Sequence, residues 1–218
     1  MAFQIIDKVI KMRLGAVLYN DFELLDAYGP LEMFGCLGDE LEIVVIAENK
    51  GPVKSSGGPQ TVAEYDFTDA PVLDLVLLPG GIGTVPELAN EKLLDFLRER
   101  CPAATINMSV CSGSALFAKA GLLDGLRATS NKMFFSLATS QSDQVKWVEA
   151  ARWVDAGRYV TSSGVSAGTD MALAVIERLH GTERALEVAA YTEYQWHRDA
   201  DTDPFENSLN KGDLNQVG

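Results

Sequence analysis

Cysteine and histidine are scarce in this chain, and the few present are not arranged as disulfide pairs or metal ligands. The 218 residues include three cysteines, Cys36, Cys101 and Cys111, and two histidines, His180 and His197. No two cysteines form a CxxC pair, and their spacing is too irregular for a disulfide framework. We therefore expect no metal site, no cofactor, and a reducing, cytoplasmic compartment.

Positive charge is also in short supply. Lysine and arginine number 18 against 31 aspartates and glutamates, which gives a formal net charge of -13. Nucleic acids and anionic membrane surfaces would repel such a chain, so we expect neither as a partner. No apolar run approaches the ~20 residues that cross a bilayer. The start, MAFQIIDKVIKM, lacks the basic region, apolar core and cleavage site of a signal peptide.

Apolar sequence is plentiful, and it alternates between two patterns. Short β-rich runs predict strands over 13–19, 41–48, 60–67, 72–81 and 104–110, and a hairpin over 145–164 with its turn at 155–157. Helical spacing predicts helices near 24–35, 84–101, 166–181 and 182–196. Strands this apolar suit a mostly parallel sheet covered by helices. We expect a single α/β domain over 1–218.

Two local features refine this prediction. Thr84 and Glu87 have the spacing of a capping box at the start of the helix over 84–101. From His197 onward the chain is polar, and we expect this C-terminal tail to fray or to pack loosely.

The segment INMSVCSGSALFAKAGLL, residues 106–123, passes from a buried strand through Cys111 into a helix start. Such a crossing forces a sharp, strained turn that lifts its central side chain above the sheet edge. The residues two before and two after, Ser109 and Gly113, are small, as that turn requires. The helix N-terminus favours a thiolate, which indicates a nucleophile. A buried, structural cysteine fits the local pattern equally well.

Two further features fall at the same carboxyl edge of the predicted sheet, where open parallel sheets bind ligands. The run LLPGG at 77–81 ends a strand in a glycine turn. Backbone N–H groups of Gly81 and Ser112 are candidates to stabilise a developing anion, although Gly80 and Gly81 also suit a plain tight turn. Asp26, at the start of the first helix, is either a cap or a general acid or base.

Four segments jointly resemble the ThiJ/PfpI superfamily, the Parkinsonism-linked, class I glutamine-amidotransferase-like group. They are GAVLYNDFELLDAYGPLEMF, VLLPGG, SVCSGSALFAKAGLLDGLRATS and SSGVSAGTDMAL, which follow the family's order from about residue 13 to about residue 190. The resemblance implies a flavodoxin-like three-layer α/β/α sandwich with a cysteine nucleophile elbow, and a homodimer. Within the family, the motifs are most similar to the isonitrile (isocyanide) hydratase-like members.

The resemblance also implies roles for individual residues. Cys111 would be the nucleophile, Asp26 its acidic partner and Ser112 the neighbour that carries a hydroxyl. The implied oxyanion-side and substrate-binding residues are Gly80, Gly81, Ser112, Gly164 and Val165.

Two departures from the family pattern concern histidine. Relatives often read ATTHW where this chain reads ATSNKMF, which places Asn131 at the histidine position. Protease- and glyoxalase-like branches carry a histidine directly after the cysteine, where this chain has Ser112. A Cys–His dyad is therefore not supported. The chain also lacks the helix-turn-helix extension of the regulator relatives, so we do not expect DNA binding.

These observations lead to one favoured function and two alternatives. We expect a cofactor-free enzyme that hydrates a small isocyanide to an N-substituted formamide through a Cys111 thioimidate. The first alternative is another cysteine-dependent activity, such as that of an amidase or of a glyoxalase or deglycase. The second is a non-enzymatic, redox-sensing stress protein that uses Cys111. Fold alone does not separate these three.

Overall fold

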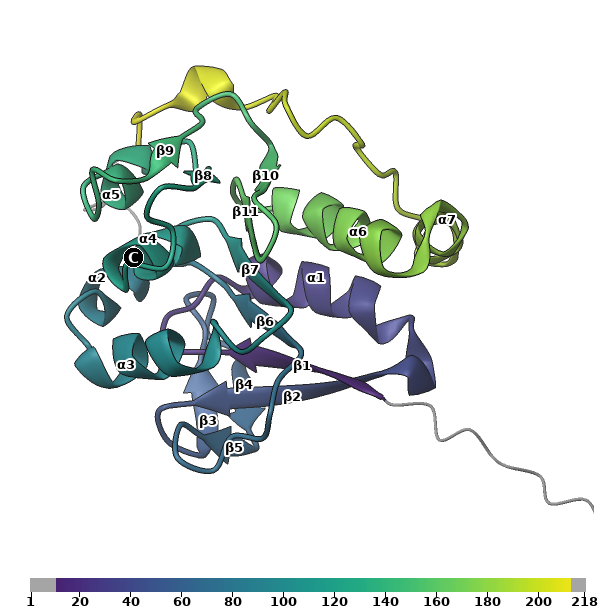
Figure 1. The fold of residues 1–218 in the computed structure, drawn as a ribbon, viewed down its shortest axis with the longest axis horizontal. Helices are drawn as coiled ribbons and strands as arrows, with labels where there is room; N and C mark the ends of the chain where they lie inside the picture. The colour runs from purple at the N-terminus through teal and green to yellow at the C-terminus, as the bar shows by residue number, and fades with distance from the viewer. Residues whose placement is uncertain (1–10, 213–218) are drawn as a thin grey trace, which may run out of the picture.

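A seven-stranded sheet forms the centre of the protein, seen in a computed structural model that describes residues 11–212 (Figure 1). The strand order is β10-β11-β7-β6-β1-β2-β5, and every neighbouring pair except β10–β11 is parallel. The strands are β1 (Met12–Val17), β2 (Leu41–Ala47), β5 (Tyr65–Asp66), β6 (Leu75–Leu78), β7 (Ile106–Val110), β10 (Trp153–Asp155) and β11 (Tyr159–Ser162). Most of the N-terminal segment that we expect not to be a signal peptide lies outside the described residues.

Helices cover both faces of this sheet (Figure 1). One face carries α1 (Leu24–Gly35), α6 (Ala167–His180) and α7 (Thr182–Tyr191), and the other carries α2 (Thr84–Glu87), α3 (Glu91–Arg100) and α4 (Gly113–Lys119). The alternation of side chains along β6 explains the two layers, because Leu75 and Leu77 join one core cluster while Val76 and Leu78 join the other. The three-layer α/β/α sandwich is therefore confirmed.

Smaller elements complete the chain. They are β3 (Gly51–Lys54) paired with β4 (Gln60–Ala63), β8 (Arg127–Ala128) paired with β9 (Lys146–Trp147), helix α5 (Phe135–Thr139), and the short 3-10 helices η1 (Gly38–Glu40) and η2 (Glu206–Ser208). The predicted helix over 24–35 and the hairpin at 155–157 are confirmed, the latter with Gly157 at φ 86°. No helix within residues 11–212 is long and apolar enough to cross a membrane.

The predicted strand over 60–67 is wrong as a single element. Residues 60–63 form β4 and pair with β3 in a separate hairpin, and only Tyr65–Asp66 join the main sheet. The split follows from pairing: β4 is antiparallel to its sequence neighbour β3, whereas β5 needs a parallel partner at the sheet edge.

The single helix over 84–101 is also wrong, and so is its capping box. The segment divides into α2 and α3, and Asn90 caps α3 by accepting the Lys92 and Leu93 N–H groups. Thr84 caps nothing, because its hydroxyl contacts the side chains of Tyr19 and Ser112 instead.

The C-terminal tail does not fray over its described part, contrary to expectation. It leaves α7, crosses the molecule and returns to the segment before α5 (Figure 1, yellow). Two backbone bonds hold its end: the Asn210 N–H donates to the Lys132 carbonyl at 2.8 Å, and the Gly212 N–H donates to the Met133 carbonyl at 3.0 Å. Polarity alone predicted exposure, but backbone pairing and one buried carboxylate fix the tail.

That carboxylate, Asp203, belongs to a buried group of four charged side chains. Its oxygens lie 3.8 Å from Lys132 Nζ and 3.7 Å from an Arg152 guanidinium nitrogen. Arg152 also pairs with Asp170, at 2.5 Å. All four residues are at most 5 % exposed. Two positive and two negative charges thereby compensate each other between the tail, the segment before α5, the residue before β10 and helix α6.

We predict that Lys132→Met destabilises the fold strongly, because it leaves Asp203 as a buried carboxylate with one remaining cationic partner. Removing one member of a buried pair costs about 3–5 kcal/mol. The double variant with Asp203→Asn is expected to lose less, since no excess charge stays buried. Urea unfolding at neutral pH measures both. Lys92→Met is the control, because its pair with Glu48 is exposed and worth about 0–1 kcal/mol. Equal losses in the single and double variants would contradict this reading.

The same lysine gives a pH signature. Burial lowers the pKa of Lys132 to about 8, against the charges of Asp203, Glu149 and Glu206, which raise it. The unfolded chain then binds more protons than the folded protein between pH 8 and the ordinary lysine pKa of 10.5. Stability rises with pH wherever the unfolded state binds more protons. The difference in unfolding free energy between wild type and Lys132→Met should therefore grow across this window, measured by urea titrations at several pH values.

Candidate active site

Cys111 stands at the turn between β7 and α4 with φ of 58°, a conformation that is strained for a residue with a side chain. Its backbone is tied on both sides. The N–H donates to the carbonyls of Ser162 and Ser163, each at 3.2 Å. The carbonyl accepts from the hydroxyls of Ser114 at 3.1 Å and Ser130 at 3.0 Å. The predicted cysteine elbow is confirmed.

Close approach of strand and helix sets the shape of this elbow. A Cβ added to Gly113 would lie 2.5 Å from the Leu78 carbonyl oxygen and 2.7 Å from that of Pro79. The other predicted small position, Ser109, is fully buried in β7. The start of α4 thus lies directly on the carboxyl end of β6, which is possible only without a side chain at residue 113.

Asp26 lies in the first turn of α1 and is fully buried. It does not cap the helix: Glu23 is the N-cap residue, and Asp26 Oδ2 accepts from the Gly80 N–H at 2.9 Å. Oδ1 has no hydrogen-bond partner among the described residues. Burial raises the pKa of Asp26 well above its ordinary value, and the charge of Glu23 adds to this, while the Gly80 N–H and the Cys111 thiol act against it. A carboxyl group in this position retains a proton more readily than an exposed one.

The Cys111 thiol shares this environment. Burial raises its pKa well above the ordinary value, and the charge of Asp26 raises it further. The Ser112 N–H, the Asn131 side chain and the Ser112 side chain act in the opposite direction. The expected preference for thiolate at the helix start is therefore outweighed by burial. Because each group disfavours ionisation of the other, the Cys111–Asp26 pair resists the loss of its last proton.

Gly81 and Ser112 contact each other instead of jointly facing an anion. The Gly81 N–H donates to Ser112 Oγ at 3.1 Å. Gly81 has φ of 125°, and a Cβ there would lie 2.5 Å from the Asp21 carbonyl oxygen and the Glu23 nitrogen. In this structure the Ser112 N–H acts on the Cys111 thiol, and the Gly81 N–H donates to Ser112 Oγ. A role of these two N–H groups in stabilising an anion stays a prediction.

The structure brings the Asn131 side chain to the cysteine. Its Oδ1 accepts the Phe134 N–H at 3.1 Å, so its NH₂ group points the other way. A Cβ added to Gly164 would lie 2.1 Å from Asn131 Nδ2 and 3.0 Å from Cys111 Sγ. Gly164 therefore packs against both groups. An amide in place of the imidazole can donate to the sulfur but cannot accept a proton from it.

A cavity of about 250 Å³ opens beside Cys111. Its polar or reactive lining residues are Glu23, Gly81, Cys111, Ser112 and Asn131. Its apolar walls are Ile82, Val85, Met133, Phe134, Leu137 and Val165. Of these walls, only Val165 was expected from the sequence; the segment over 133–137 carried no motif. The lining contains neither of the two histidines.

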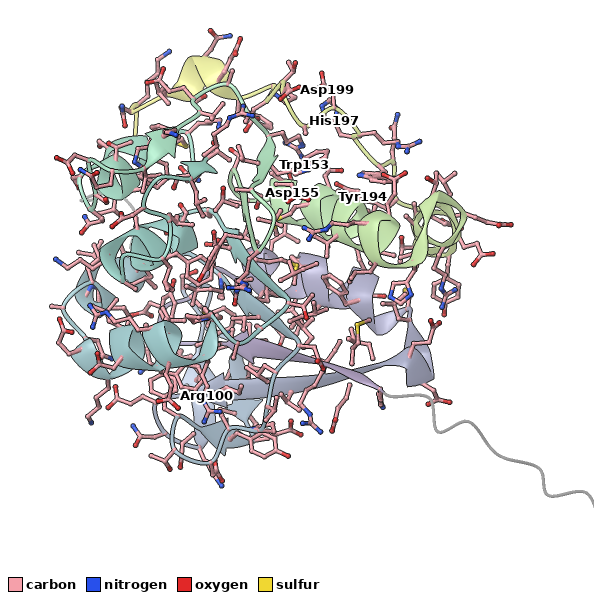
Figure 2. All side chains as sticks on the ribbon, viewed as in Figure 1. Arg100, Trp153, Asp155, Tyr194, His197 and Asp199 are labelled. Atoms are coloured by element: carbon pink, nitrogen blue, oxygen red, sulfur yellow. The ribbon has the colours of Figure 1, made fainter. Side chains whose placement is uncertain are left out.

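The remaining cysteines and both histidines lie elsewhere. His180 pairs with Glu40. His197, labelled in Figure 2, lies at the start of the tail, and its backbone N–H donates to Asp170 Oδ1 at 2.9 Å. Cys101 is fully buried at the end of α3, and Cys36 is half-buried after α1.

An α/β sandwich with a cysteine at a strained elbow and a buried carboxyl group beside it defines a class of cysteine-elbow proteins. The chain belongs to the DJ-1/PfpI family, whose sequence profile matches residues 12–178. It is 34% identical over 184 residues to isonitrile hydratase of Pseudomonas putida, which covers 84% of this chain and 78% of that protein.

Two further comparisons agree with the family. Protein DJ-1 homolog B of Arabidopsis thaliana is 34% identical over 160 residues, which is 72% of this chain and 33% of that longer protein. The crystal structure of a ThiJ/PfpI family protein from Pseudomonas syringae superposes with a TM-score of 0.76 at 30% identity, covering 89% of this chain and 77% of that one.

We predict that Asp26→Asn lowers the pKa of the Cys111 thiol, because it removes the nearby negative charge that raises this pKa. Alkylation of Cys111 by iodoacetamide near pH 7.5 should then be faster than in wild type, measured by peptide mass spectrometry. Glu32→Gln, an exposed acid on the same helix, is the control and should change nothing. Cys101, whose pKa burial raises well above its ordinary value, should stay unmodified in the folded protein. A slower reaction in Asp26→Asn would contradict the coupling.

Proposed function

We propose that this protein hydrates a small, uncharged isocyanide to the N-substituted formamide through a covalent adduct on Cys111. One observation carries the proposal: the apolar cavity presents one thiol, Cys111, which is coupled to the buried Asp26 carboxyl group, and no histidine is in the cavity lining. The similarity to isonitrile hydratase of Pseudomonas putida supports the same reaction class.

The cavity suits such a substrate. Six apolar side chains form its walls, and Glu23 is the only ionisable side chain in the lining apart from Cys111. An isocyanide is neutral and carries a compact reactive carbon, so it enters an apolar space without the cost of burying a charge. A zwitterionic amino acid such as glutamine would find no cationic side chain among these lining residues.

In the first half-reaction, Cys111 sulfur bonds to the terminal carbon of R–N≡C. One carbon–nitrogen π bond is lost, and the carbon takes the proton that the Cys111–Asp26 pair holds. The product is the thioimidate R–N=CH–S–Cys111, and Asp26 is left as a carboxylate. Asp26 Oδ1 is the donor atom that remains free for this transfer, because Oδ2 is bound to the Gly80 N–H.

In the second half-reaction, water adds to the thioimidate carbon. The Asp26 carboxylate takes one proton from this water as a general base and passes it to the imine nitrogen, which gives the tetrahedral adduct R–NH–CH(OH)–S–Cys111. The hydroxyl proton of the adduct then moves to Asp26 as the C–S bond breaks. R–NH–CHO departs, and the Cys111–Asp26 pair regains its proton. Each atom of water is accounted for: oxygen and one hydrogen leave in the product, and the other hydrogen restores the pair.

The geometry favours this reaction over acyl transfer. An amidase or glyoxalase-like step develops charge on a carbonyl oxygen, which needs preorganised N–H donors. Here the Gly81 N–H is engaged by Ser112 Oγ. Addition to an isocyanide develops charge on carbon instead, where Asp26 supplies a proton. Selective oxidation favours exposed thiolates, and burial of Cys111 opposes both exposure and ionisation.

We predict that an aryl or alkyl isocyanide produces a formamide and a transient protein adduct with the mass of the whole isocyanide, located on Cys111 by mass spectrometry. Cys111→Ala should abolish adduct and product. Asp26→Asn should fold normally and lose most turnover, on the order of 10²–10⁴-fold, because it cannot supply the proton.

Cys36→Ala is the matched control, since that thiol lies outside the cavity, and it should retain wild-type activity. Methylglyoxal and glutamine serve as comparison substrates. Absence of both adduct and formamide across several isocyanides would reject the proposal. Consumption of methylglyoxal would then support the carbonyl-enzyme alternative.

A further inference from the structure

Three buried hydroxyl groups form a chain that ends beside the catalytic candidate. Tyr19 Oη lies 2.6 Å from the Pro79 carbonyl oxygen and 2.9 Å from Thr84 Oγ1. Thr84 Oγ1 lies 2.8 Å from Ser112 Oγ. The three residues are 6 %, 0 % and 5 % exposed. Each hydroxyl proton is therefore donated to a protein acceptor and not to bulk water.

Counting protons fixes the direction of this chain. The Pro79 carbonyl can only accept, so Tyr19 donates to it. The Tyr19 oxygen is then the acceptor for Thr84, and Thr84 Oγ1 is the acceptor for Ser112. If Thr84 instead donated to Ser112, no proton would lie between the Tyr19 and Thr84 oxygens, which are 2.9 Å apart. A buried oxygen pair without a hydrogen bond costs free energy.

Ser112 Oγ therefore faces the cysteine with its proton turned away. It donates to Thr84 and accepts the Gly81 N–H at 3.1 Å. The alternative acceptor, the Gly81 carbonyl, lies farther away, at 3.3 Å. The Ser112 side chain lies within hydrogen-bond reach of the Cys111 thiol, and as a donor it would lower the pKa of that thiol. The direction of the hydroxyl chain removes this donor, because the Ser112 proton is directed to Thr84. The lone pair that remains on Ser112 Oγ can accept a hydrogen bond from the thiol but leaves the sulfur without a hydroxyl donor.

We propose that Tyr19 and Thr84 are positioning residues that hold the Ser112 hydroxyl as a hydrogen-bond acceptor toward Cys111, so that the proton stays within the Cys111–Asp26 pair. A hydroxyl that donated to the sulfur would stabilise the free thiolate and release this proton. The proposal concerns the cysteine itself and does not depend on which substrate the cavity takes.

The substitution that tests this proposal, Tyr19→Phe, leaves the other ionisable groups around Cys111 unchanged. Asp26 faces the thiol from α1, and Glu23 lines the same cavity. Tyr19 is itself near the thiol, and Glu87 acts on Tyr19. Burial raises the pKa of Tyr19 well above its ordinary value, so the phenol is neutral near pH 7. Tyr19→Phe therefore changes no charge there, and a shift in the Cys111 titration reports the hydrogen-bond direction.

We predict that Tyr19→Phe lowers the apparent pKa of Cys111 and speeds its alkylation near pH 7.5 by roughly tenfold, the size expected for one hydroxyl donor on a thiolate. Without the phenol oxygen, the Thr84 proton turns to Ser112 Oγ and the Ser112 proton turns to the sulfur. The measurement is the pH profile of iodoacetamide alkylation at Cys111 in the full chain, followed by peptide mass spectrometry. Thermal melts establish that the variant is folded.

Further variants separate the effect of hydrogen-bond direction from the effect of packing. Thr84→Val also frees the Ser112 proton and should lower the pKa, whereas Thr84→Ser keeps a hydroxyl and should retain the wild-type profile. Ser112→Ala combined with Tyr19→Phe should equal Ser112→Ala alone. Tyr159→Phe removes a buried phenol that packs against Phe117 outside the chain and should change nothing. An unchanged or raised pKa in both folded Tyr19→Phe and Thr84→Val would overturn the proposal.

Discussion

The contact between the start of α4 and the carboxyl end of β6 is the constraint on which the site depends. Gly113 lies against the Leu78 and Pro79 carbonyls so closely that a Cβ there would overlap them. This contact holds the elbow with Cys111 at positive φ and places Ser112 beside the Gly80–Gly81 turn. The Gly80–Gly81 turn also binds Asp26, because the Gly80 N–H donates to the Asp26 carboxyl group. One close approach of backbone thus brings residues from three separate segments into one buried cluster.

Burial then decides the chemistry of that cluster. An exposed cysteine at a helix start would favour the thiolate, and an exposed aspartate would be ionised. Packed together away from water, both groups resist ionisation, and the pair retains a proton. When sulfur attacks the carbon of an isocyanide, that carbon must take up a proton, and the retained proton supplies it. Asn131 fits the same logic, because it can donate to the sulfur but cannot remove the proton as a histidine would.

The wall of the cavity depends on a different part of the chain. Met133, Phe134 and Leu137 line it from the segment around α5. That segment is held by backbone bonds from the C-terminal tail and by the buried Lys132–Asp203 pair. The tail lies beyond residues 12–178, which match the family profile. The shape of the pocket therefore rests partly on residues outside the range that matches the family profile, whereas the elbow and its acid lie within that range.

The sequence by itself determined the layers, the elbow and the identity of its cysteine and acid. Those features are local: apolar period, small residues around Cys111, and motifs with fixed spacing. Only the tertiary structure decided the rest, because it depends on contacts between distant segments. Thr84 reads as a helix cap until Tyr19 and Ser112 lie against it. The tail reads as solvent-exposed until Asp203 meets Lys132 and Arg152. The position of Cys111 at a helix start predicts a lowered pKa, but burial beside Asp26 raises it. Desolvation depends on how the whole protein packs around the thiol, so no local sequence pattern predicts it.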